Sequence, residues 1–248
     1  MTHSNLSCDT ILFDLDGTLI QVSQATFISA YFAEISKVFI RLGLDADQAI
    51  KALWVGTTAM VLNDGTMTNA QRFWQTFAKE LQLTEEELAA VEAQCDSFYT
   101  HEFDAVRSVV PAGSIAKQLM RLLQGKGYEL VLATNPLFPA CAVTTRLHWI
   151  DLEPQDFSLI THYTNSTYCK PSLGYYQEIF TKIGKTPQQC LMIGNNPVED
   201  MTVAQLGSET YLVTDCLENE KNVDISGLRS GTLADLGSYL AALPDLRA

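Results

Sequence analysis

The spacing of apolar residues divides the chain into two regions. Residues 10–15 form one short apolar run with polar residues at its ends, which is typical of a buried strand in a parallel sheet. From about residue 23 to about residue 104, apolar residues instead recur every three or four positions, as they do on one face of an amphipathic helix. We therefore expect a helical region directly after the first strand.

Four helices are expected in this region. They are predicted over Ser23–Gly43, over Asp45 to about Met60, and from Thr68 and Thr84 onward. The last two starts are capping boxes, in which a threonine is followed three residues later by a side chain that can bond back to it, Gln71 or Glu87. The Asn-Asp-Gly-Thr stretch at 63–66 has turn chemistry and separates the second helix from the third.

Helical and strand patterns alternate from residue 111 onward. The expected helices are Gly113–Leu123, Phe138–Trp149, Ser172–Ile183, Val198–Leu206 and about Leu233–Leu243, and the expected strands are Glu129–Ala133, Phe157–Thr161, Cys190–Gly194 and Glu209–Thr214. Such alternation gives right-handed crossovers and a mostly parallel sheet. The sequence therefore predicts an α/β fold, with a Rossmann-like core over residues 1–20 and 105–248 and an inserted helical domain over 21–104.

Composition and charge narrow the possible functions. The 248 residues carry a formal net charge of −13, which argues against a nucleic-acid binder because displacing counterions requires clustered Lys and Arg. Asp14 and Asp16 interrupt the first apolar stretch, and no stretch approaches the roughly 20 apolar residues of a transmembrane helix, so we expect neither a signal peptide nor a membrane anchor. The six cysteines form no CxxC pair, and we expect reduced thiols in a cytoplasmic protein.

Polar residues with chemical potential follow several of the predicted strands. They lie in four stretches: Asp-Leu-Asp-Gly-Thr at 14–18, Thr-Asn at 134–135, Lys-Pro at 170–171, and Gly-Asn-Asn-Pro-Val-Glu-Asp at 194–200. Open parallel sheets bind their ligands beyond the carboxyl ends of the strands, so we expect these stretches to converge there. Together they supply carboxylates, a hydroxyl, an ammonium and further oxygen ligands, which is the set that a phosphoryl group needs.

Each stretch has a candidate role in phosphoryl transfer. Asp14 comes first at the strand end and is the candidate nucleophile, forming an aspartyl-phosphate, while Asp16 could protonate the leaving oxygen and later deprotonate water. Lys170 would neutralise charge on the phosphoryl oxygens and the Thr134 hydroxyl would donate a hydrogen bond to them. The expected substrate-binding residues are Gly17, Thr18, Thr134, Asn135 and Lys170. Mg²⁺ is the expected cofactor, because it is held by one or two carboxylates together with phosphate and water.

The order of these motifs resembles the haloacid dehalogenase-like hydrolase superfamily, whose members are mostly Mg²⁺-dependent phosphatases. The resemblance spans nearly the whole chain and implies that the helical insert is a cap that closes over the site and selects the substrate. By motif matching it implies Asp14 as nucleophile, Asp16 as acid and base, and Thr134 and Lys170 as phosphate ligands. It also implies metal support from Asp200 and a metal bond from the backbone carbonyl of Asp16.

Asn195 departs from the motif pattern of that superfamily. The resemblance implies an aspartate that ligates Mg²⁺ directly at this position, whereas an amide oxygen carries no charge. This difference has three possible consequences. Asp200 could take over as the direct ligand, the metal could be held more weakly, or the chain could have lost activity. We favour the first two possibilities because the other motif residues are all present: Asp14, Asp16, Thr134, Lys170 and Asp200.

The leading hypothesis is a cytoplasmic Mg²⁺-dependent phosphatase acting on a small phosphorylated metabolite such as a sugar phosphate, a phosphoglycolate-like acid or a nucleotide. A phosphomutase with the same Asp14 nucleophile is one alternative. A phosphate-binding or partner-binding protein without turnover is another, motivated by Asn195. Dehalogenation is disfavoured, because the resemblance implies that this chemistry lacks the second acid that Asp16 supplies. The oligomeric state is left open.

Overall fold

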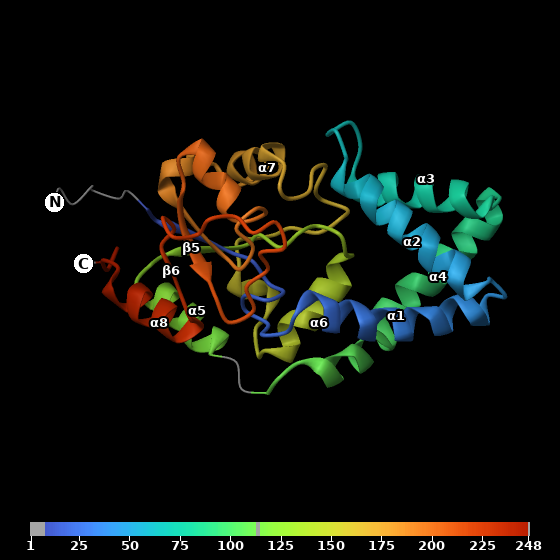
Figure 1. Cartoon of the computed structure of the whole chain (residues 1–248), viewed down its shortest axis with the longest axis horizontal. Helices are drawn as coiled ribbons and strands as arrows, with labels where there is room; N and C mark the ends of the chain where they lie inside the picture. Colours follow the sequence, from blue (N-terminus) through green and yellow to red (C-terminus); the bar gives the residue numbers. More distant parts are fainter. Residues whose placement is uncertain (1–7, 113–114, 248) are drawn as a thin grey trace.

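The computed structural model describes residues 8–112 and 115–247, and its core is a six-stranded parallel sheet (Figure 1). The strands lie in the order β3-β2-β1-β4-β5-β6, and each strand is parallel to its neighbours. Their bounds are β1 Thr10–Phe13, β2 Glu129–Leu132, β3 Leu159–Ile160, β4 Cys190–Gly194, β5 Glu209–Val213 and β6 Ser230–Gly231. The predicted α/β fold with a mostly parallel sheet is confirmed.

Helices cover both faces of the sheet, because its inner strands are apolar on both sides. In β1, Ile11 and Phe13 pack into one buried cluster and Leu12 packs into a second cluster, and all three side chains are fully buried. The first cluster includes α5 (Ala116–Gly125), α6 (Ala140–Trp149) and α8 (Leu233–Ala242), and the second includes α7 (Leu173–Ile183) and the 3₁₀ helix η4 (Met201–Leu206). β1 therefore lies at the centre of the core, and its carboxyl end is held rigidly.

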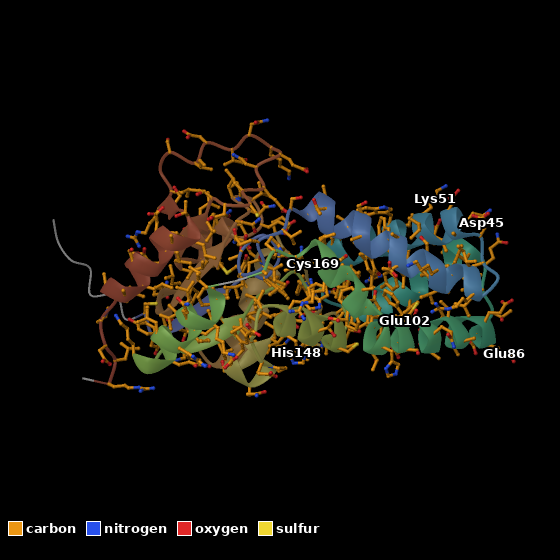
Figure 2. The ribbon with its side chains drawn as sticks, turned by 90° about the horizontal axis from the view of Figure 1, so that it is seen from below. Asp45, Lys51, Glu86, Glu102, His148 and Cys169 are labelled. Carbon is orange, nitrogen blue, oxygen red and sulfur yellow. The ribbon has the colours of Figure 1, made fainter. Side chains whose placement is uncertain are left out.

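The predicted helical region follows β1 and extends to one end of the molecule (Figure 1). It contains α1 (Gln24–Arg41), α2 (Ala46–Val61), α3 (Asn69–Leu81) and α4 (Glu85–His101), followed by the 3₁₀ helix η1 (Phe103–Val109). Both predicted capping boxes form, at Thr68 and at Thr84. In Figure 2, Asp45 and Glu86 lie at the outer end of this region, whereas Cys169 lies where it meets the sheet.

The predicted helix over Val198–Leu206 is wrong in its first three residues, which lie in a turn, and only a 3₁₀ helix over Met201–Leu206 forms. The Asn196 side-chain oxygen accepts the N–H groups of Val198 at 2.9 Å and Glu199 at 3.0 Å, as the side chain of a capping residue does. The resulting turn directs residues 195–200 toward the carboxyl end of β1.

Smaller differences from the predicted elements occur at the edges of the sheet and at helix starts. The two-residue strand β6 and the helix η1 were not predicted, and the strand expected over Phe157–Thr161 is only Leu159–Ile160. The helix expected from Gly113 begins at Ala116, and residues 113–114 lie outside the described residues. Two further 3₁₀ helices span Pro154–Asp156 and Pro187–Gln189. Across residues 8–112 and 115–247, no helix is both long and apolar enough to cross a bilayer.

Candidate active site

Asp14 is the first residue beyond β1 and is held in place by three neighbours. Its backbone N–H donates to the Ile193 carbonyl at 2.9 Å, which continues the ladder between β1 and β4. Its Oδ1 accepts from Lys170 Nζ at 2.7 Å and its Oδ2 accepts from the Thr18 hydroxyl at 3.2 Å. Both carboxylate oxygens are therefore oriented by the protein, as a nucleophile requires.

Lys170 joins Asp14 to Asp200 beneath the site. Its ammonium is 1% exposed and also donates to Asp200 Oδ1 at 2.6 Å, while Asp200 Oδ2 accepts the Asn196 N–H at 2.9 Å. Burial disfavours the charged form of Lys170, but the adjacent Asp14 and Asp200 carboxylates outweigh that effect and raise its pKa well above the usual range. Lys170 therefore carries a fixed positive charge that does not reach the surface.

Burial disfavours the charged form of Asp14, the candidate nucleophile, as well. It raises the pKa of Asp14, an effect that Lys170 opposes and that the Asp200 and Asp16 carboxylates reinforce. An uncompensated carboxylate in this position is costly, so Asp14 depends on positive charge around it. Lys170 supplies one such charge from below, and the pocket above leaves room for another.

Gly194 lets Asp200 approach the end of β4. A Cβ added to Gly194 would lie 2.2 Å from both Cγ and Oδ2 of Asp200, so Gly194→Ala must displace that carboxylate from Lys170. We expect Gly194→Ala to lower the free energy of unfolding by about 1–3 kcal/mol and to reduce activity. Urea unfolding measures the first effect. Gly125→Ala is the matched control, since a Cβ there meets nothing within 4 Å, and it should leave stability equal or higher.

Asp16 is paired with Arg146, a residue that the sequence analysis missed. Arg146 is on α6 and 1% exposed, its Nη1 donates to Asp16 Oδ2, and its guanidinium lies 4.5 Å from the centre of the Phe138 ring. Asp16 Oδ1 is buried and has no hydrogen-bond partner among the described residues, and the same is true of Arg146 Nη2. The pair therefore fixes the orientation of Asp16 through Oδ2, while Oδ1 makes no hydrogen bond to the described residues.

The contribution of the Asp16–Arg146 ion pair to stability can be measured. We expect Arg146→Met to lower the free energy of unfolding by about 1.5–3 kcal/mol, because Asp16 loses a charged hydrogen-bond partner but keeps partial access to water. Activity should fall too, since Asp16 is no longer oriented. Arg107→Met removes an exposed arginine instead and should change stability by no more than about 0.5 kcal/mol in the same urea titration.

The loop after β2 brings Thr134 and Asn135 to the same pocket. The Thr134 carbonyl accepts from the Thr161 hydroxyl at 2.7 Å and from the Tyr175 hydroxyl at 2.8 Å, which fixes the loop from below. Asn135 Nδ2 donates to Glu199 Oε2 at 3.1 Å. The Thr134 and Asn135 side chains are therefore placed beside Asp14, as expected for residues that contact a phosphate.

Gly17, Thr18 and Asn195 form a layer beside this pocket. Gly17 has φ +78, and a Cβ on it would lie 2.2 Å from Asn195 Nδ2, so glycine is needed for this close approach. The Gly17 N–H donates to the Ile20 carbonyl at 2.8 Å, and the buried Thr18 hydroxyl lies 3.1 Å from Asn195 Oδ1. Gly17, Thr18 and Lys170 do not line the pocket, so their substrate-binding role stays a prediction. Thr18 here contacts Asp14 and Asn195 instead.

The acidic pocket above these residues has a cavity volume of about 90 Å³. Its described lining contains no Lys or Arg and carries five carboxylates, from Asp14, Asp16, Glu199, Asp200 and Glu218. Burial raises the pKa of Glu199, and it raises that of Glu218 to about 7. A phosphate dianion cannot be stabilised in such a pocket unless a cation enters with it.

The donor set of the acidic pocket fits Mg²⁺. All of its candidate ligands are carboxylate, amide or carbonyl oxygens, as a hard cation prefers, and Asp14 Oδ2 and Asn195 Oδ1 face the same Thr18 hydroxyl. Among the described residues, no group of three or more His, Cys, Asp or Glu side chains is arranged to hold a metal ion by itself. Mg²⁺ in proteins is usually bound by one or two carboxylates, with phosphate and water as its other ligands.

A comparison with models of known protein families shows which family this chain belongs to. The family model described as haloacid dehalogenase-like hydrolase matches residues 8–207. The chain belongs to the haloacid dehalogenase-like (HAD-like) hydrolases. A search of curated proteins found no match.

Solved HAD-like structures share the whole fold with this chain. A predicted phosphoglycolate phosphatase from Haemophilus somnus 129PT is 19% identical with a TM-score of 0.59, and the alignment covers 95% of this chain and 99% of that one. YfnB from Bacillus subtilis, bound to magnesium, is 19% identical with a TM-score of 0.57 and coverages of 94% and 98%. A β-phosphoglucomutase from Clostridium difficile is 14% identical with a TM-score of 0.56 and coverages of 92% and 93%. At these identities the likeness establishes the fold of this HAD-like hydrolase, with its inserted cap, and does not select its substrate.

Proposed function

We propose that this HAD-like hydrolase is a Mg²⁺-dependent phosphatase that hydrolyses a small phosphomonoester through an aspartyl-phosphate on Asp14. The observation that carries the proposal is the orientation of the Asp14 carboxylate, held by Lys170 and Thr18 at the floor of the acidic pocket. The presence of six unpaired cysteines supports a reducing compartment such as the cytoplasm.

The proposed reaction has two steps, and the protein groups account for each proton. An Asp14 oxygen attacks phosphorus while protonated Asp16 gives its proton to the leaving alkoxide, releasing an alcohol. Asp16 then takes a proton from water, the resulting hydroxide attacks phosphorus, and Asp14 is released with inorganic phosphate. Thr134 and Asn135, which line the pocket, would orient the phosphoryl oxygens. Asp14, Asn195 and the Asp16 carbonyl would hold Mg²⁺, with Asp200 in support, and the ion would neutralise charge on those oxygens.

Phosphate release tests this proposal. With acetyl phosphate, p-nitrophenyl phosphate and a panel of phosphorylated metabolites, we expect release at millimolar Mg²⁺ that falls to background in EDTA and returns when Mg²⁺ is added in excess. Metal dependence follows from the acidic pocket, whose carboxylates repel an unaccompanied phosphate. Release that is unchanged in EDTA would contradict the role of the metal, and no release from any compound would favour a binding protein.

A further inference from the structure

A second cavity lies beside the acidic pocket, inside the helical region. We call it the aromatic hollow. It is formed by α1, α2, α3, α4 and the loop after β2, and its most prominent side chains are Tyr31, Phe32, Trp54, Phe73, Trp74 and Phe138. It offers about 60 Å³ to the centres of water-sized molecules, several times the roughly 10–15 Å³ that a single water needs. The hollow therefore has room for a small organic group.

The aromatic hollow and the acidic pocket share a wall. Ile28, Leu137 and Phe138 line both cavities. Phe138 lies 5.3 Å from Tyr31 in the hollow, measured between ring centres, and 4.5 Å from the guanidinium of Arg146, which is the partner of Asp16. The two cavities therefore adjoin each other at this wall, and a group attached to a phosphate in the acidic pocket would lie next to the hollow.

No charged side chain lines the aromatic hollow among the described residues. Its polar groups are few: the Tyr31 and Tyr99 hydroxyls are 2.6 Å apart and bond each other, and Trp74 bonds the Tyr163 hydroxyl. Burial raises the pKa of Tyr31 and Tyr99, so both remain neutral. A carboxylate would find no cation here, and a sugar would leave most of its hydroxyl groups without partners.

The lining residues of the hollow differ widely in exposure. Phe39 and Phe77 are each 1% exposed, whereas Trp54 on α2 is 47% exposed, so part of the lining reaches solvent. The Trp54 ring meets Phe32 edge to face, with ring centres 5.3 Å apart. Ligand sites are commonly such concave, mainly apolar cavities with a few placed polar groups.

We infer that the aromatic hollow binds the leaving group of the substrate, and that the substrate is a phosphomonoester of an uncharged aromatic or alkyl alcohol about one ring in size. This inference rests on the proposed phosphatase function and narrows its substrate class. The phosphate is held at Asp14 and the apolar body lies against Phe138, Tyr31 and Phe73. Phosphoglycolate-like acids and sugar phosphates are correspondingly poor substrates.

Binding of two phosphonates that cannot be hydrolysed tests the hollow independently of turnover. Isothermal titration calorimetry in the presence of Mg²⁺ measures both affinities, and the fluorescence of Trp54 and Trp74, which line the hollow, reports its occupancy. We expect benzylphosphonate to bind at least about tenfold more tightly than methylphosphonate, because its ring is removed from water. Equal affinities for the two compounds would overturn the inference.

Two neighbouring threonines on α2 give a matched pair of variants. Thr57 lines the hollow, so Thr57→Phe fills it and should reduce the ratio of the two affinities to near one, whereas Thr58→Phe places the same ring on the exposed side of the helix and should keep the wild-type ratio. A preference that survives in Thr57→Phe would also overturn the inference.

Measurements of turnover can refute this inference and the proposed phosphatase function independently of each other. We expect kcat/KM for benzyl phosphate to exceed that for glucose 6-phosphate and phosphoglycolate at least tenfold. Hydrolysis of acetyl phosphate together with a preference for the sugar phosphate would refute the hollow's role and leave the phosphatase proposal standing. Selective benzylphosphonate binding without hydrolysis of any phosphate would refute the phosphatase and leave the hollow standing.

Discussion

We expect Asp14→Asn to lower kcat for phosphomonoesters at least about 10³-fold, because an amide cannot serve as the nucleophile that accepts the phosphoryl group. The change is nearly isosteric. It keeps an oxygen that can accept a hydrogen bond from Lys170 or from the Thr18 hydroxyl. The measurement is phosphate release at saturating Mg²⁺ and substrate, with the melting temperature recorded for both proteins.

The melting temperature serves as the control for this prediction. A folded Asp14→Asn protein without turnover places the loss in the chemistry, and a protein that keeps more than about a tenth of wild-type activity would contradict a nucleophilic role. Asp9→Asn is the matched variant, since Asp9 lies just before the same strand, pairs with Lys185 near the surface and should leave kcat unchanged.

We expect Lys170→Met to lower both stability and activity strongly. The substitution leaves the buried Asp14 and Asp200 carboxylates without the ammonium that contacts both, at 2.7 Å and 2.6 Å. Removing one partner of such a buried pair costs about 3–5 kcal/mol of unfolding free energy. We expect kcat to fall about 10²–10³-fold because a fixed charge near the phosphoryl group is lost. Urea unfolding and phosphate release measure the two effects.

A second substitution separates the two effects of losing Lys170. Lys170→Met combined with Asp200→Asn removes one of the two facing carboxylates, so stability should recover in part while activity stays low. Lys37→Met is the control for losing a lysine as such, since Lys37 pairs with Glu34 on the surface and such pairs contribute about 0–1 kcal/mol. Full activity in Lys170→Met would contradict the account of the site.

The sheet and the approach of its polar loops could be predicted because they depend on local sequence patterns. Compact apolar runs predicted β1, β2, β4 and β5 closely, and capping chemistry predicted where α3 and α4 begin. Since these strands are parallel, Asp14, Thr134 and Asp200 had to meet at one edge. The pocket does bring these three side chains together.

Other features depend on long-range contacts that no local pattern encodes. Arg146 lies 130 residues after Asp16 in the sequence. The only local sign of its role is that an arginine stands on the mainly apolar face of an expected helix. The turn over residues 197–200 was also missed, because the apolar spacing from Val198 onward is the same for a turn followed by a short 3₁₀ helix as for a continuous helix. The aromatic hollow was equally hidden, because periodicity shows that Tyr31 and Phe32 face inward but not that a cavity remains between them.

The central claim is the covalent aspartyl-phosphate on Asp14, and trapping it is the most direct test. In Asp16→Asn, p-nitrophenyl phosphate should still phosphorylate the protein, because p-nitrophenolate leaves without a proton, while the second step lacks its base. After acid quench, borohydride reduces an acyl-phosphate to an alcohol and so converts the modified aspartate to homoserine, which peptide mass spectrometry locates. The account predicts homoserine at position 14, dependent on p-nitrophenyl phosphate. Reduction at another residue, or release of p-nitrophenol with no modified residue, would contradict it.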